Sequence, residues 1–175
     1  QRMGGRSRAL VDGGATAEPT SVARDGHERL AIIGAGPAGL SAAIYAARAG
    51  LQPVVIAPRG GGQLLGKGVT VENYPGVVGG VTGPGVVALM RAHALEFGVA
   101  FEESAVSAVD LSRRPFSLRV VAGNASSAAD AAAPSREIAA HAIVIATGAD
   151  SIWLGVEGEA RYRGGGGWSR ATCDG

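Results

Sequence analysis

The chain has 175 residues, 46% of them hydrophobic, which supports one core of ordinary size but not two full domains. Sixteen lysine and arginine residues balance fifteen aspartate and glutamate residues, so the net charge of +1 gives no electrostatic reason to expect nucleic acid or a membrane as partner. The apolar runs end before the ~20 residues of a membrane span, and the single cysteine, Cys173, excludes a disulfide framework and a cysteine-based zinc site.

Residues 1–28 combine mixed charge, glycine and small polar residues without an apolar period, which predicts a disordered leader. Their arginines would also suit the tail of an organelle transit peptide, but the acidic residues of the same segment argue against that interpretation. Because the chain runs from Gln1 to Gly175 without a closing element, we expect a fragment or an incomplete gene model. We expect a cytoplasmic location, with chloroplast or mitochondrion as the alternative.

A compact strand–helix–strand unit opens the part of the chain that is expected to be ordered. Residues 30–33 are a short apolar run that ends at a glycine, as a buried parallel strand does. Residues 37–49 predict a helix, because proline suits its first position, alanine fills its interior and Gly50 suits the position after its end. Residues 53–57 predict the second strand and complete a βαβ unit.

A glycine-rich motif connects the first strand to the helix. Its residues, in the pattern G-x-G-x-x-G, are Gly34, Ala35, Gly36, Pro37, Ala38 and Gly39. The first glycine permits a tight turn, the second lets backbone approach a pyrophosphate, and the third lets helix pack on strand. The helix N-terminus adds N–H groups and the positive end of its dipole. The motif in this context predicts dinucleotide binding; the alternative is a glycine-rich turn with a structural role only.

The acidic residue that usually binds the ribose at the end of the second strand is missing. This strand ends at Ala57 and Pro58, and Arg59 follows. Either backbone groups hold the ribose or Arg59 lies along the phosphates. The missing carboxylate weakens any argument that this loop is specific for NAD.

The remaining elements follow in order. Residues 59–85 predict a glycine-rich loop, and residues 84–97 a helix whose apolar stripe contains Val86, Val87, Met90, Ala94 and Phe97 and which Gly98 closes. Residues 99–110 predict a strand, and residues 116–120 alternate as a half-exposed strand does. Residues 122–135 predict a long solvated hairpin loop, and residues 138–146 end in an apolar strand just after His141. The three histidines have no ligand-like spacing.

Five further motifs carry a resemblance to a known family. They are Gly61-Gly62-Gln63-Leu64, Val71-Glu72-Asn73-Tyr74-Pro75-Gly76, Val81-Thr82-Gly83-Pro84, Ile145-Ala146-Thr147-Gly148-Ala149 and Ala171-Thr172-Cys173-Asp174-Gly175. In this order, behind the glycine motif, they resemble the low-molecular-weight NADPH-dependent thioredoxin reductases over residues 29–175. Residues 113–116 look closest to the plant, algal and fungal members.

The resemblance implies an α/β fold, a truncated Rossmann-like FAD-binding domain of the pyridine nucleotide-disulfide oxidoreductase type. This fold has a βαβ unit and a small antiparallel β arm. Residues 29–150 would be the first segment of the FAD/NAD(P)-binding domain, and residues 151–175 the start of an inserted NADPH domain. The implied cofactor is FAD, with NADPH bound in the full-length parent at a site absent here. The implied partner is thioredoxin, and the parent would be a homodimer.

The same resemblance assigns roles to residues. Ala35–Ala38 would lie along the FAD pyrophosphate, with Pro58 and Arg59 near the adenosine. Gln63 and Asn73 would hydrogen-bond the flavin side, where amides can donate to flavin carbonyls. The remaining assigned residues are Val106 near the adenine, and Thr147 and Gly148 with their backbone close to FAD. The alternatives are turn or cap roles for the amides, core packing for Val106 and a plain strand end for Thr147. The loop at 65–70 departs from the family's run of threonines and is one residue longer.

The largest departure lies at the redox centre. The family uses a C-x-x-C pair, because thiol–disulfide exchange passes through a mixed disulfide that a second thiol resolves. Cys173 matches the flavin-side cysteine, and Arg170 occupies the place of the attacking one. We therefore expect this chain not to reduce thioredoxin. Either the sequence is degraded or incorrectly assembled, or the protein is divergent and Arg170 favours the Cys173 thiolate. The alternative functions are a related dithiol-independent flavin reductase and a non-catalytic FAD-binding remnant.

Overall fold

The computed structural model describes residues 27–58, 62–66, 70–122, 134–149, 155–158 and 161. Its centre is a six-stranded sheet with the strand order β5-β2-β1-β8-β7-β6. These strands are β1 (His27–Ile33), β2 (Pro53–Ile56), β5 (Ala100–Glu102), β6 (Ser104–Asp110), β7 (Phe116–Ala122) and β8 (Ser135–Ile145). Strands β5, β2, β1 and the second half of β8 run parallel, whereas β6, β7 and the first half of β8 are antiparallel. This mixed sheet has the predicted α/β architecture.

The predicted βαβ unit is present with nearly the predicted boundaries. Helix α1 (Pro37–Arg48) follows β1 and leads into β2, with Pro37 in its first turn. Gly50, just past the helix end, has a φ of +72°, a conformation that glycine adopts at little cost. Residues 31–33 and 54–56 are almost fully buried. Alternate residues of these strands therefore pack into different cores on the two faces of the sheet.

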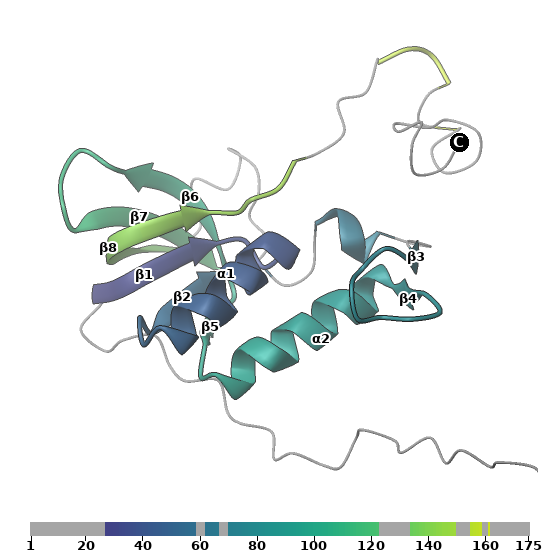
Figure 1. Ribbon diagram of the computed structural model, residues 1–175. Coiled ribbons are helices and arrows are strands. Elements are labelled where there is room, and N and C mark those ends of the chain that lie inside the picture. The colour runs from purple at the N-terminus through teal and green to yellow at the C-terminus, as the bar shows by residue number, and fades with distance from the viewer. Residues whose placement is uncertain are drawn as a thin grey trace, which may run out of the picture.

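The first core lies between the sheet and two helices. Helix α2 (Gly83–Glu96) is capped by Thr82, whose Oγ1 accepts a hydrogen bond from the backbone N–H of Gly85 at 3.1 Å. Helices α1 and α2 lie side by side on one face of the parallel strands (Figure 1). Their apolar side chains pack with those of β1 and β2, and the buried members are Leu30, Ile32, Leu40, Ala43, Ile44, Ala46, Val55, Val86, Met90, Ala94 and Val99.

The predicted apolar stripe of α2 is wrong at one residue. Val86, Met90 and Ala94 are buried, but the side chain of Phe97 is 42% exposed. The helix ends at Glu96, so Phe97 is its C-cap and no longer follows the helical stripe. The centroid of its ring instead lies 5.3 Å from the centroid of the His93 ring.

The second core lies between the opposite face of the parallel strands β1 and β2 and the antiparallel part of the same sheet, which we call the meander (104–122 and 134–140). Residues 99–110, predicted as one strand, form two, because the chain leaves β5 at Glu103 and turns into β6. His141 lies within β8 and not before it. The predicted hairpin pairs β7 with β8, while residues 123–133 of its connection lie outside the described residues. The buried side chains are Ala31, Ile33, Val54, Ile56, Leu118, Val120, Ile138 and Ala140.

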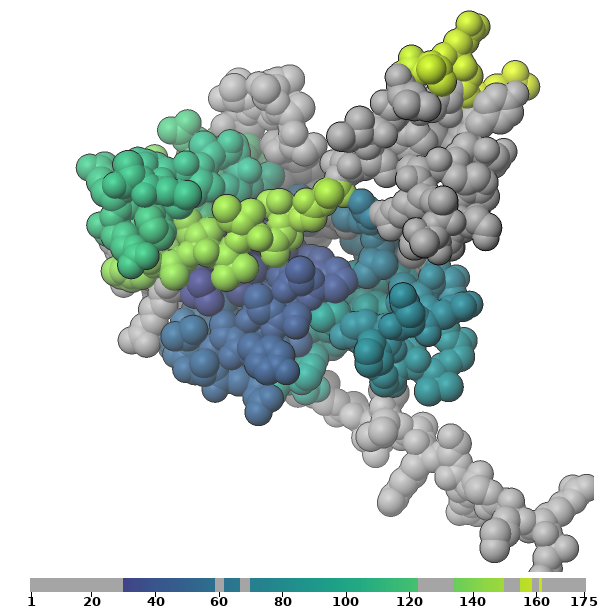
Figure 2. Space-filling view, turned by 45° about the horizontal axis from the view of Figure 1, so that its top comes forward, coloured from purple at the N-terminus to yellow at the C-terminus, as the bar shows by residue number. Residues whose placement is uncertain are grey.

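A small antiparallel arm, as predicted, lies beside the N-terminal end of α2. It consists of β3 (Thr70–Val71) and β4 (Val81–Thr82), preceded by the 3-10 turn η1 (Gln63–Leu65). Figure 2 shows β8 in yellow-green, between the green residues of β6 and β7 above it and the purple-to-blue residues of β1, α1 and β2 below it, with the teal residues of the arm and α2 to the right. Within the part of the chain that the structure describes, no helix is long and apolar enough to cross a membrane.

Candidate dinucleotide-binding site

A cavity of about 910 Å³ opens at the carboxyl ends of the parallel strands. Its walls come from the turns after β1, β2 and β8, from η1, and from α2 and β5. The lining residues are Gly34, Ala35, Gly36, Pro37, Ala57, Pro58, Gly62, Gln63, Leu64, Leu65, Val87, Arg91, Phe101, Glu102, Glu103, Ala146, Thr147, Gly148 and Ala149. Open α/β sheets bind ligands at this edge, in the crevice outside the carboxyl ends of their parallel strands.

Two glycines of the motif allow close approach of backbone segments. The N–H of Gly34 donates to the carbonyl of Ile56 at 2.9 Å, and the φ of Gly34 is +109°. A Cβ at Gly34 would lie 2.2 Å from the carbonyl oxygen of Ala146, and a Cβ at Gly39 would lie 2.0 Å from the carbonyl oxygen of Gly34. A side chain at Gly34 would therefore push the turn after β1 away from the turn after β8. A side chain at Gly39 would push α1 away from the turn at Gly34.

Gly36 differs from both, because it faces open space. A Cβ built there meets no atom within 4 Å, and Gly36 lines the cavity. It is the N-cap of α1, no side chain caps this end, and the first turn holds no acidic residue. Among the residues that the structure describes, the first N–H groups of α1 thus lack a side-chain cap, and no carboxylate of the first turn offsets the positive end of the helix dipole. The cradle that a Cβ would fill fits the diphosphate of a dinucleotide.

The structure brings eight of the predicted site residues together around this cavity. They are Gly34, Ala35, Gly36, Pro37, Pro58, Gln63, Thr147 and Gly148. Ala38 and Gly39 lie in the first turn of α1 and do not line the cavity. Arg59 and Cys173, together with Arg170, lie outside the described residues.

Two predicted residues lie away from the cavity. Asn73 is exposed in the loop after β3, and it does not line the cavity. Val106 pairs with Val120 across β6 and β7 and packs against the second core. This position agrees with core packing, the alternative that the sequence leaves open for Val106. A contact between Val106 and the adenine stays a prediction.

Gln63 connects two walls of the cavity that are distant in sequence. Its side-chain Nε2 donates a hydrogen bond to the carbonyl oxygen of Ala149 at 2.5 Å. This bond holds η1 against the segment that follows β8. The amide is thereby oriented in the cavity wall, with its carbonyl oxygen still able to accept a hydrogen bond.

The sequence missed the wall that α2 and β5 form. The guanidinium carbon of Arg91 lies 3.9 Å from the ring centroid of Phe101, and Arg91 Nη2 lies 3.5 Å from a carboxylate oxygen of Glu103. With Val87, these residues line the cavity. No local motif marks them, since they meet only when α2 packs over the end of β5.

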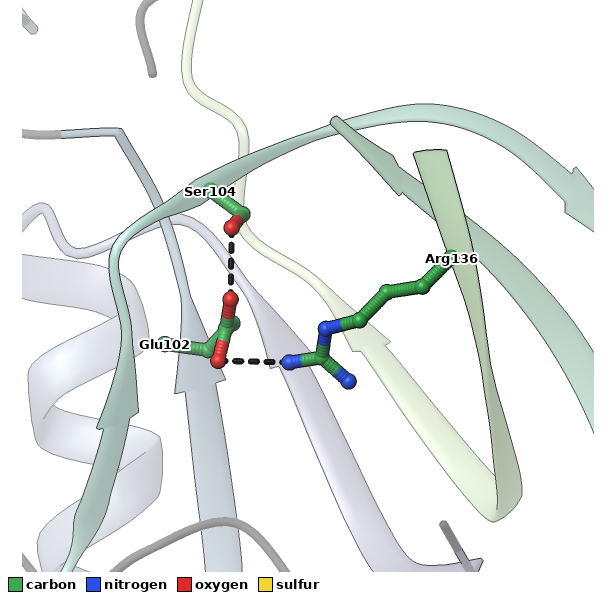
Figure 3. A network of polar contacts seen from close by, with 3 residues as sticks. All are labelled: Glu102, Ser104 and Arg136. Carbon is green, nitrogen blue, oxygen red and sulfur yellow. Dashed lines mark hydrogen bonds and ion pairs between the residues drawn. The ribbon is translucent and has the colours of Figure 1, made fainter. Parts of the chain in front are cut away.

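Glu102 also lines the cavity and is held by two partners (Figure 3). Its Oε1 accepts a hydrogen bond from Ser104 Oγ at 2.5 Å, and its Oε2 lies 2.7 Å from Arg136 Nη2. The three residues come from β5, β6 and β8, so the network joins the parallel strands to the meander. Among the described residues, no group of three or more His, Cys, Asp or Glu side chains is arranged to hold a metal ion.

Comparison with known proteins agrees with this geometry. The family model described as "Pyridine nucleotide-disulphide oxidoreductase" matches residues 28–174. The thioredoxin reductase of Vibrio cholerae is 40% identical over 149 residues, which are 85% of this chain and 43% of that protein. A protein of Pseudomonas fluorescens named glucosaminate ammonia-lyase is 38% identical over 85% of this chain and 42% of its own length.

A solved structure of a thioredoxin reductase from Gloeobacter violaceus superimposes with a TM-score of 0.61 and 31% identity. The match covers 79% of this chain and 42% of that one. The chain thus spans less than half the length of the relatives it matches. These similarities confirm the resemblance to thioredoxin reductases and the Rossmann-like fold. The three relatives are bacterial, so the plant, algal and fungal affinity of residues 113–116 stays a prediction.

Proposed function

Since this chain belongs to the pyridine nucleotide-disulphide oxidoreductase family, we propose that it binds FAD at the carboxyl edge of its parallel sheet. It would serve as the FAD-binding segment of an NADPH-dependent disulfide reductase. The observation that carries the proposal is the open cradle at Gly36, which lies between two glycines in close backbone contact. A purely structural turn would have no need to leave that position empty and facing a cavity.

The chain's own groups act on the diphosphate through the backbone. The turn is fixed by Gly34 and Gly39, and the N-terminus of α1 presents N–H groups and a positive partial charge to the anion. Because Gly36 has no side chain, the diphosphate can approach the helix end closely. Bound FAD would supply the chemistry of hydride and electron transfer.

The cavity wall formed by η1 and the turn after β8 suits the flavin part of the cofactor. Gln63 is oriented there by its bond to Ala149 and keeps an acceptor oxygen. Thr147 and Gly148 bring backbone groups to the same wall. We propose that these groups orient the flavin, with Asn73 as a more distant contributor.

We also propose the domain division and the substrate that the resemblance implies. Residues 29–150 would hold the first part of the FAD domain and residues 151–175 the start of an NADPH domain, in a cytoplasmic, homodimeric parent that acts on thioredoxin. Because Arg170 stands where the attacking cysteine would be, this chain as written would lack the dithiol for that exchange.

A relative with a different name favours a second candidate function, a flavin enzyme that does not use a dithiol. Arg170 favours a further alternative, a non-catalytic FAD-binding remnant. The relative named glucosaminate ammonia-lyase matches the same segment almost as well as the thioredoxin reductases do. Similarity over this segment therefore supports FAD binding under either function and does not by itself select thioredoxin as substrate.

The test of FAD binding is the substitution Gly36→Asp. Aspartate is a favoured N-cap and would preserve or slightly raise the stability of α1, while its carboxylate would occupy the cradle and repel a diphosphate. We expect the wild-type chain to retain FAD on gel filtration and Gly36→Asp to lose at least about tenfold in affinity. The control is Ala88→Asp, which adds the same charge on an exposed position of α2. Equal affinity of both variants and wild type would contradict the proposal.

A further inference from the structure

We infer that Arg91 is a positioning residue for the adenine of the bound dinucleotide, which stacks on its guanidinium plane. This inference rests on the proposed FAD binding and deepens it. It assigns a function to the wall of the cavity that lies farthest along the strand order from the glycine motif. None of the residues in that wall belongs to a motif of the sequence.

The guanidinium of Arg91 is held in place from two sides. The ring of Phe101 lies under it at 3.9 Å, and the carboxylate of Glu103 lies 3.5 Å away. The Arg91 side chain nevertheless keeps 38% of its surface exposed, and Arg91, Phe101 and Glu103 all line the cavity. A long side chain fixed in this way loses little further freedom when a ligand binds, so its planar group is preorganised.

The chemistry of this wall favours a base over a phosphate. The charge of Arg91 is already offset by Glu103, and the N-terminus of α1 is available for the diphosphate. What the wall still offers is a flat cationic plane, flanked by the apolar Val87 and the ring of Phe101. Guanidinium planes and aromatic rings are the surfaces on which proteins stack nucleobases.

The strand order gives the spacing that such a ligand needs. The glycine motif follows β1, whereas Phe101 and Glu103 lie at the end of β5, two strands away across β2. Neighbouring strands are about 4.8 Å apart, so the two sites are separated by roughly 10 Å along the sheet edge. That separation suits an extended nucleotide with its diphosphate at α1 and its base at Arg91.

The test compares the affinity for ADP with that for ribose 5-diphosphate, which lacks the base, by titration calorimetry on the full chain. We expect the wild type to prefer ADP by about tenfold. Arg91→Lys keeps the charge but loses the plane, and we expect it to reduce the preference to about twofold by weakening ADP binding alone. Phe101→Leu should reduce the preference partly, since it keeps an apolar support without the ring. The control is Arg119→Lys, at an exposed arginine of β7.

An unchanged preference in Arg91→Lys would overturn the inference, as would an equal loss of affinity for both ligands. These results are distinguishable from failure of the proposed function. If the wild type retains FAD and Gly36→Asp loses it, the proposed function stands and only the role of Arg91 is in question. If the wild type binds neither FAD nor ADP, the proposed function and the inference fail together.

Discussion

The turn after β1 and the meander both pack against the central strands, but different parts of the chain hold them. In the turn, backbone contacts backbone: a Cβ at Gly34 would lie 2.2 Å from the carbonyl oxygen of Ala146. In the meander, side chains such as Leu118, Val120 and Ile138 fill the space above β1 and β2. The candidate site therefore depends on glycines, which have no side chain to separate the backbone segments. The meander depends on the volume of its buried side chains.

The largest effect is expected at the turn, from Gly34→Ala. The methyl group would meet the backbone of Ala146, and alanine is disfavoured at a φ of +109°. We expect the free energy of unfolding to fall by about 4 kcal/mol, measured by urea denaturation. The matched control is Gly50→Ala, where φ is +72° but no atom lies within 4 Å. It should cost only about 1 kcal/mol, and equal losses would show that the clash has no role.

In the meander, the substitution Leu118→Ala should act through lost volume. Leu118 is fully buried, and its truncation should lower the free energy of unfolding by about 3 kcal/mol. Because Leu118 does not line the cavity, the affinity of the folded chain for FAD should stay at the wild-type value. Arg119→Ala, at the exposed neighbouring position, serves as the control. If Leu118→Ala binds FAD more weakly under conditions in which the variant is still fully folded, the two regions are less separate than proposed.

A smaller effect is expected from the contact that joins the two regions, the pair of Glu102 and Arg136. Arg136 is 49% exposed, so solvent screens much of this interaction. We expect a double-mutant cycle of Glu102→Gln and Arg136→Ala to give a coupling of less than about 1 kcal/mol, which declines in high salt. A larger coupling that salt does not change would mean that the pair is effectively shielded from solvent.

The smallest effect is expected at Asp110, at the far end of β6. The hydroxyl and backbone N–H of Ser112, with Arg113 nearby, hold the pKa of Asp110 below its ordinary value of 3.8. A lowered folded-state pKa favours folding above the ordinary value, and this contribution is lost as pH falls through the folded-state pKa. The NMR titration of Asp110 should shift upward in Ser112→Ala. It should not move in Ser107→Ala, whose hydroxyl bonds to the carbonyl of Arg119 instead.

Local rules predict much of the fold. Pro37 and Gly50 delimit α1 nearly to the residue, because each has a conformational preference that needs no tertiary partner. The alternation of residues 116–120 predicts β7, because successive side chains of a strand point to opposite faces of the sheet. The prediction for 99–110 misses the break at Glu103, since β5 and β6 are distinguished only by which neighbours they pair with.

The candidate site divides in the same way. The glycine motif is predicted from the sequence, because its requirements are local to one turn. Arg91 and Glu102 are not, because an arginine on a helix and a glutamate at the end of a strand are typical of any surface. Their place in the cavity wall arises only from how α2 and β5 pack, and Val106 shows the converse, since it resembles a site residue but lies against the second core.

Strand β8 belongs to both regions at once. Ala139 and Ala140 pair with β1 on one side and with β7 on the other. If β8 loses either neighbour, the amides that it bonds to that neighbour become exposed to water, so the protection of β8 depends on both regions. Amide hydrogen exchange at these two alanines should therefore proceed only through global opening, so that the meander and the nucleotide edge melt in one cooperative transition.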